Sequence, residues 1–395
     1  MKKLLGSILV FAVAAAALGA QDTGKILATY KANFAKASLT VKIEILQDAA
    51  SNKSVQEMGP LFLDALDFIL GNSSFIGSDP QYRQLAQIAI EQIAAIKHAP
   101  AKQSLWKVFQ LDPDTTMRVK TAGALGIIST GDQEIIGNLN KWLESQNSVF
   151  ATGKTPDLQV VSAVLQAVGK LGDPSSFPIL FKSMILGYSE KVTALAREAL
   201  LSVNGDFQEM ITGIVKNSSF LEKRQALSMA LESDKLNEEQ KGSVAEYALD
   251  VGLHTAPTDA ASKDISRDMR QAAVRALSER KWSKATSLLI EHLDTTIMEN
   301  DRGLSDKRFL LEAVAALGNM ATHEASVRLT NYLVLLNSYT EKGRSYDEQT
   351  VLTVIDNLGK LGDKVAFDDL MYTQYLNYTS PIKKKARAAL DNLKW

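Results

Sequence analysis

A five-residue segment, Gly-Lys-Leu-Gly-Asp, occurs twice in this chain, at 169–173 and at 359–363. Looser copies of the Ala- and Leu-rich run before it recur along the sequence, for example at 117–126. The position of Ala124 in that run is matched by Ala167, Ala199, Ala230, Ala276, Ala316, Asn357 and Ala389. The spacing averages about 38 residues, which is typical of stacked two-helix repeats. This periodicity constrains the fold more than any other feature of the chain.

The residues that end each run predict tight turns between helices. A glycine closes the run and suits the left-handed position after a helix. The next residue is an aspartate that can accept hydrogen bonds from the free N–H groups of the following helix. The predicted caps are Asp132, Asp173, Asp206 and Asp363. No stretch shows sustained strand alternation, so the sequence predicts an all-α fold.

The pattern Arg118, Ala122, Ala124-Leu125-Gly126 with its Gly-Asp turns resembles HEAT repeats, particularly the short bacterial type first described in phycobilin lyases. The resemblance covers roughly residues 40–395 and implies a right-handed superhelical α-solenoid of HEAT/armadillo-like repeats, about 8–10 units long. Two units depart from the pattern, at 232–234 and at 278–282. We expect irregular turns there, where the superhelix bends or breaks.

The N-terminus predicts export. Lys2 and Lys3 precede an uncharged stretch at 4–18, and small residues follow at 17–20. This order is typical of a secretory signal peptide at 1–20, cleaved near residues 19–21. The alternative is an uncleaved anchor, but the stretch is short against the roughly 20 residues that span a bilayer. We therefore expect residues 21–395 to form one solenoid without a membrane segment, in the periplasm of a two-membrane bacterium, with full secretion as the second choice.

The composition limits the classes of partner and of functional site that this chain can have. The chain has 44 basic and 45 acidic residues, and removal of Lys2 and Lys3 makes the mature balance more acidic. This charge does not favour a nucleic-acid binder. The absence of cysteine excludes disulfides, thiolate metal sites and a lipoprotein anchor. We expect no cofactor.

The connections opposite the Gly-Asp turns expand at 147–157, 253–266, 295–305 and 338–348. Insertions along one edge of a solenoid commonly map to a binding rim, although surface insertions are also tolerated without any partner. The segment at 253–266 is the candidate for a break between two lobes, although we expect it to be a loop inside one solenoid. Candidate partner-binding residues are Lys154, Arg302, Arg344 and Tyr346 on the rim, with Tyr372 and Tyr375 near the C-terminus.

Other motifs have simpler interpretations. The four histidines lack the spacing of a helical zinc site, and we expect them at the surface or at helix ends. Gly-Lys-Leu-Gly-Asp and the Gly-Lys-Thr at 153–155 lack the phosphate-loop spacing. Tyr372, Tyr375 and Tyr378 form either a contact patch or terminal packing. The basic cluster at 383–387 is typical of a solvated helix face or a terminal cap.

These observations favour a non-enzymatic scaffold or adaptor that binds another protein, most naturally one of the envelope or periplasm. The alternative is an envelope enzyme, or a protein that binds a ligand or glycan in its concave face. A glycosidase of this kind would need two carboxylates about 5–9 Å apart in a cleft. No catalytic residue, cofactor ligand or metal ligand is assigned from the sequence.

Overall fold

The computed structural model describes residues 24–344 and 346–394, so the predicted signal peptide at 1–20 lies outside the described residues. Within these ranges the regular secondary structure is helical. The only β-type pairing described is one isolated bridge between Asp363 and Lys394. The all-α prediction is therefore confirmed for this part of the chain.

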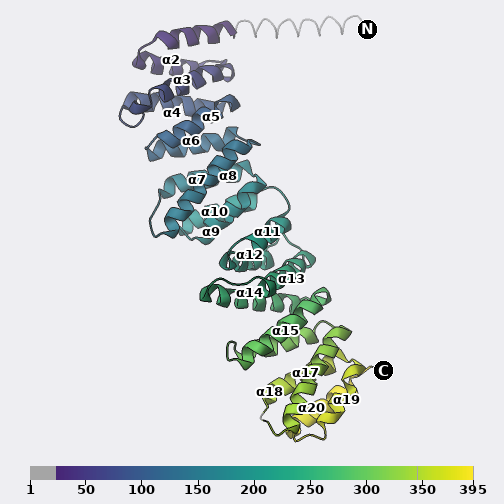
Figure 1. Cartoon of the computed structure of the whole chain (residues 1–395). Helices are drawn as coiled ribbons and strands as arrows, with labels where there is room; N and C mark the ends of the chain where they lie inside the picture. The colour runs from purple at the N-terminus through teal and green to yellow at the C-terminus, as the bar shows by residue number, and fades with distance from the viewer. Residues whose placement is uncertain (1–23, 345, 395) are drawn as a thin grey trace, which may run out of the picture. The chain divides into compact units, whose positions relative to one another are not determined.

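The helices form two compact units, which meet at Gly205 and Asp206. In the first unit, residues 24–36 are helical. The further helices of this unit, labelled in Figure 1, are α2 (Leu39–Ser51), α3 (Gly59–Gly71), α4 (Pro80–Ala95), α5 (Lys102–Leu111), α6 (Thr115–Ile128), α7 (Gln133–Ala151), α8 (Leu158–Leu171), α9 (Phe177–Ile185) and α10 (Glu190–Ser202).

The second unit repeats this succession of helices. Its members are α11 (Phe207–Asn217), α12 (Phe220–Glu232), α13 (Glu238–His254), α14 (Ala260–Glu279), α15 (Thr286–Asp301), α16 (Lys307–Gly318), α17 (His323–Glu341), α18 (Glu348–Leu361), α19 (Phe367–Thr373) and α20 (Ser380–Asp391). Short 3₁₀ turns precede several of them, including η4 (Pro174–Ser176) and η6 (Lys364–Ala366).

The boundary between the two units lies at Gly205–Asp206. The connection at 255–259 joins α13 to α14 inside the second unit, and these two helices pack against each other. Their contact buries Val244, Ala245, Leu249 and Met269. The connection is therefore a loop within one hydrophobic core.

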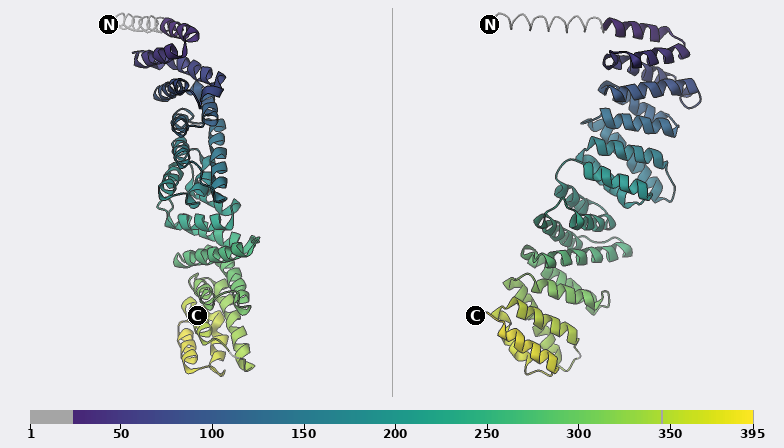
Figure 2. Two further views of the ribbon diagram at one scale, coloured as in Figure 1. Left: turned by 90° about the vertical axis from the view of Figure 1, so that its left-hand side faces the viewer. Right: turned by 180° about the vertical axis from the view of Figure 1, so that it is seen from behind.

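Each unit is built as two layers of helices. In the first unit the even-numbered helices pack in succession from α2 to α10, and the odd-numbered helices pack from α3 to α9. In the second unit the same order runs from α12 to α20 and from α11 to α19. Each odd helix also packs on the even helix that follows it. Figure 2 shows the same helices from two further sides. This arrangement within a unit is that of a helical repeat array.

The two units also repeat each other in sequence. Residues 133–205 align without a gap with residues 323–395 at a constant spacing of 190, and 23 of the 73 aligned positions are identical. Gly172 and Gly362, which end α8 and α18, both adopt the left-handed conformation, with φ of 62° and 68°. Only glycine takes this conformation without a steric cost from Cβ. The chain is therefore organised as an internal duplication above the level of the two-helix repeat.

Unusual local features confirm the duplication upstream of the aligned segment. Lys42 in α2 is buried and donates to the carbonyl of Phe34. Lys223 in α12 is also buried, and it donates at 2.7 Å to the carbonyls of Val215 and of the residue after it. Each ammonium group thus satisfies carbonyls left free at the end of the preceding helix.

A second pair of matched features lies at the start of α3 and α13. A side chain on Gly59 would collide with the ring of His98, and one on Gly242 would collide with the ring of Trp282. The residue before each ring, Lys97 or Lys281, has a positive φ. Lys281 lies in one of the two segments where the sequence predicted an irregular turn.

The small residues of the repeat allow the even helices to approach closely. A Cβ atom on Gly169 would lie 2.9 Å from Cα of Ala199, and one on Gly359 would lie 2.9 Å from Cα of Ala389. Real Cβ atoms do not approach backbone atoms this closely. The glycine at the end of one run is therefore a packing site for the alanine of the next run, which explains why the two residues recur together.

Candidate functional site

The three basic rim residues predicted from the sequence are exposed and follow or precede a left-handed glycine. Lys154 lies after Gly153 in the α7–α8 connection, and Arg344 lies after Gly343 in the α17–α18 connection. Arg302 lies at the end of α15. Lys154 and Arg344 are 190 residues apart, so they occupy the same place in the two units. Lys154 belongs to the first unit, and the other candidates belong to the second.

Four of the predicted residues, Arg344, Tyr346, Tyr372 and Tyr375, lie in the second unit, in the α17–α18 connection and the α19 segment, and both segments contact the end of α17. We call the side chains of these segments the tyrosine surface, and it comprises Tyr339, Arg344, Tyr346, Met371, Tyr372 and Tyr375. The Arg344 guanidinium lies 5.4 Å from the ring centre of Tyr339. The ring of Tyr346 stands edge-on to that of Tyr378, with centroids 4.8 Å apart. Tyr378 itself is buried and supports the surface from beneath.

The remaining side chains of the tyrosine surface point to solvent. Tyr375 is 78% exposed, Tyr372 is 39% exposed and Met371 is 36% exposed. A hydrogen bond to Glu341 raises the pKa of Tyr372 and ties α19 to the end of α17. Because tyrosine, methionine and arginine are the residues enriched in protein interfaces, this composition suits a contact surface.

A buried asparagine holds α19 against α17 and so fixes the tyrosine surface. Asn337 donates to the backbone carbonyl of Asp369 at 3.2 Å and accepts from Thr373 Oγ1 at 3.4 Å. Asn147 plays the same part in the first unit, where it accepts from Ser183 at 3.1 Å and from Tyr188 at 2.6 Å. The scaffold beneath this surface is therefore shared by the two units.

The side chains on the scaffold differ between the units. At the positions of Tyr346, Tyr372 and Tyr375, the first unit carries Pro156, Lys182 and Ile185. The fold therefore forms without exposed tyrosines at these positions. Their presence in the second unit is not a requirement of helix formation or packing.

The four aspartates predicted as caps accept hydrogen bonds from the N–H groups that follow them. Asp132 accepts from Ile135, Asp173 from Ser175, Asp206 from Gln208 and Glu209, and Asp363 from Val365.

Three of these carboxylates have a second role that sequence reasoning missed, because each also contacts the first residue of the preceding helix in its layer. Lys102 of α5 pairs with Asp132, Gln133 of α7 donates to Asp173 at 2.7 Å, and His323 of α17 lies 2.7 Å from Asp363. The hydrogen bond from Lys102 is the main reason that the pKa of Asp132 is lowered. The caps thus also join successive repeats.

The prediction that the histidines lie at surfaces or helix ends is wrong for His292. This residue lies inside α15 and is 3% exposed. Burial, and then the charge of Arg270, lower the pKa of His292 to about 3, so the ring is neutral. His254 does lie at the end of α13, where it contacts Asp250 at 2.9 Å and Glu291 at 3.1 Å. Residues 24–344 and 346–394 contain no group of three or more side chains suited to hold a metal ion.

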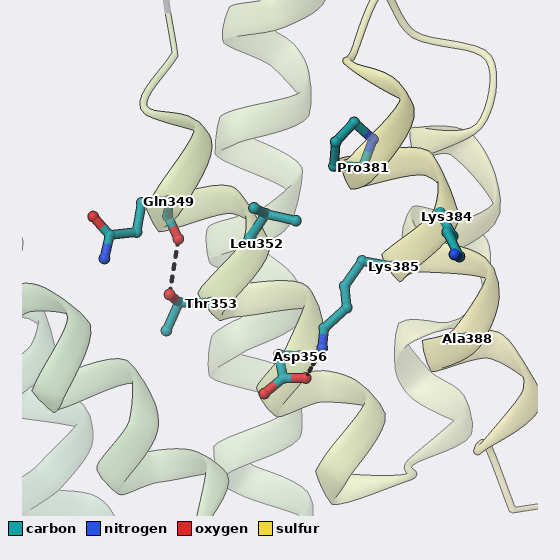
Figure 3. A pocket seen from close by; sticks show the side chains of 8 residues that line it. All are labelled: Gln349, Leu352, Thr353, Asp356, Pro381, Lys384, Lys385 and Ala388. Carbon is teal, nitrogen blue, oxygen red and sulfur yellow. Dashed lines mark hydrogen bonds and ion pairs between the residues drawn. The ribbon is translucent and has the colours of Figure 1, made fainter.

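Matching grooves lie between even helices of the two units. The larger has a volume of about 540 Å³ and lies between α18 and α20, as Figure 3 shows. The other, of about 330 Å³, lies between α8 and α10 and includes Leu195 and Glu198. These residues are 190 positions before Lys385 and Ala388, which line the larger groove. A comparison of the chain with itself at this spacing is the signal that could have located both grooves.

No protein-family model matches this chain, and no curated protein matches its sequence. The HEAT-type assignment therefore stays a prediction, whereas the packed helical array is observed. Among the described helices, none combines the length and the apolar character needed to cross a bilayer.

Proposed function

We propose that this protein is a non-enzymatic scaffold of HEAT-like repeats, exported to the periplasm, that binds another protein through the tyrosine surface of its second unit. The observation that carries the proposal is the contrast between the units. The same buried framework carries exposed tyrosines in the second unit and Pro156, Lys182 and Ile185 in the first.

Exposed aromatic groups have a physical cost, because their apolar rings remain in water in the free protein. When a partner covers these rings, their apolar surface is removed from water and binding is stabilised. Tyrosine and arginine contribute much of the binding energy of many interfaces. Tyr375 stands at the most exposed point, while Tyr346 rests on the buried Tyr378 and is held in place. A preorganised surface of this kind loses little side-chain entropy on binding.

The test places a photocrosslinking benzoylphenylalanine at position 375 of the exported chain in the native cells. A matched variant carries it at Ile185, the equivalent position of the first unit. We expect a discrete protein adduct from position 375, identified by mass spectrometry, and none from position 185. Equal adduct patterns from both positions would exclude the tyrosine surface as the binding site.

The replacement of Tyr372 and Tyr375 by the first unit's residues, Lys and Ile, provides the reverse control. The variant should fold, since the first unit carries these residues on the same framework. It should no longer compete with the wild-type protein for the partner that forms the adduct. A glycan in place of a protein in the adduct would replace the scaffold proposal with the ligand-binding alternative.

A further inference from the structure

The groove between α18 and α20 combines an apolar floor with lysines on one side. Leu352 of α18 and Pro381 of α20 line it together with Lys384 and Lys385. Lys385 extends from α20 to pair with Asp356 of α18, as Figure 3 shows. Among the described residues, no carboxylate lies within ion-pair distance of Lys384, which is exposed.

The charge of this groove is specific to the second unit. The three lysines at 383–385 replace Thr193, Ala194 and Leu195 of the first unit. The groove between α8 and α10 shares three equivalent positions with it, at residues 166, 195 and 198, and contains Lys170 but no lysine from α10. Lysines at these positions are therefore not a consequence of the way the helices pack.

The lysines of α20 begin at the fourth residue of the helix. They lie in the N-terminal half of the helix, and its first turn contains no acidic residue. The helix dipole disfavours cations near this end and favours anions. The equivalent helix of the first unit, α10, begins with Glu190. Lys385 is already paired with Asp356, so Lys384 is the cation of the α18–α20 groove that has no ion-pair partner among the described residues, and a negatively charged partner would complement it.

We propose that the α18–α20 groove binds an acidic segment of a partner protein, whose carboxylates face Lys384 and Lys385 and whose apolar side chains lie on Leu352 and Pro381. The apolar floor suits a peptide with alternating acidic and apolar residues. A polyanion such as nucleic acid, or an anionic lipid surface, is less suited because Asp356 stands in the groove and the whole chain has a net charge of −1. This inference rests on the proposed scaffold function but uses a different helix layer.

The probe is a fluorescein-labelled ten-residue peptide of alternating glutamate and leucine, and its binding to the chain 21–395 is measured by fluorescence anisotropy. We expect saturable binding that weakens as salt is raised. Lys384→Glu should weaken it by roughly tenfold or more, because it replaces an attractive charge by a repulsive one. Lys191→Glu, which changes an exposed lysine of α10, is the matched control and should leave the affinity unchanged.

The melting temperature of Lys384→Glu separates binding from folding. Because Lys384 is exposed and makes no ion pair among the described residues, this variant should melt close to the wild-type protein. The proposal fails if the wild-type protein does not bind the peptide. It also fails if the substitution leaves binding unchanged, or if a glutamine–leucine peptide binds equally well. Sedimentation with phosphatidylglycerol vesicles but no binding to the peptide would assign the lysines to a membrane surface and overturn it.

The two proposals fail separately. If the peptide binds but no adduct forms at position 375, the proposal for the groove is supported and the proposal for the tyrosine surface is rejected. If an adduct forms at position 375, persists in Lys384→Glu, and the peptide does not bind, the proposed scaffold function is supported and the proposal for the groove is rejected.

Discussion

The protonation of single histidines in this protein depends on whether the side chain is exposed or buried. His254 is exposed at the end of α13, where the Asp250 carbonyl and then Glu291 raise its pKa. His292 lies inside the next helix, where burial lowers its pKa to about 3. The same side chain is thus favoured in its charged form at one position and in its neutral form at the other.

His292 makes the stability of the protein depend on pH. An unfolded histidine has a pKa of about 6.5, so below that pH the unfolded chain binds a proton that the folded chain excludes. The stabilisation is therefore complete above pH 6.5 and is lost as pH falls towards 3. Between pH 6.5 and 5.5, the free energy of unfolding in urea should fall by about 1 kcal/mol more in the wild-type protein than in His292→Gln.

The comparison with His292→Gln removes the effects of other titrating groups, including the opposite contribution of His254, which both proteins share. Equal changes in unfolding free energy over this interval would show that His292 accepts a proton in the folded state.

At the scale of the helix, close approach between successive even helices holds each unit together. The glycine of one run meets the alanine of the next, as at Gly169 and Ala199. Gly123 lies in a similar run of α6, but a Cβ atom there would meet nothing within 4 Å. In the repeat, Gly126 and not Gly123 occupies the position of Gly169, and Gly123 corresponds to Gln166, so the register of the run separates the two glycines.

This difference predicts opposite effects of the same substitution. Gly169→Ala should destabilise the protein by about 1–3 kcal/mol, because α8 and α10 must move apart. Gly123→Ala should stabilise it by up to about 1 kcal/mol through helix propensity. Chemical denaturation of both variants tests the prediction. A gain in stability for Gly169→Ala would show that the even helices are not in close contact there.

At the scale of the whole molecule, the chain consists of two compact units, each made of two helix layers. The repeat of about 38 residues and the duplication at 190 residues are two levels of the same organisation. The cap residues and the buried asparagines occur in both units, whereas the tyrosine surface and the lysines of α20 occur in one. The shared residues serve the fold, and we assign the unshared ones to function.

The unit boundary predicts where the chain can be divided. Chains 24–205 and 206–395, expressed separately, should together retain the helical circular dichroism of the full protein, because each keeps its own core. Chains divided at 257/258 should together retain less, because α13 loses its packing against α14 and α15. The same loss of helicity from both divisions would contradict the boundary at Gly205–Asp206.

The sequence by itself determined the helical class and the short repeat, because glycine ends and aspartate caps act over a few residues. It also indicated the exposed rim residues. It did not indicate the burial of His292, the contact of Tyr372 with Glu341 or that of Tyr346 with Tyr378, because these depend on packing between elements about 30 residues apart in the sequence. The repeat period also concealed the unit boundary, since similar runs occur on both sides of Gly205. Only the tertiary structure decided which helices share a core, because burial is a property of packed neighbours and not of local spacing.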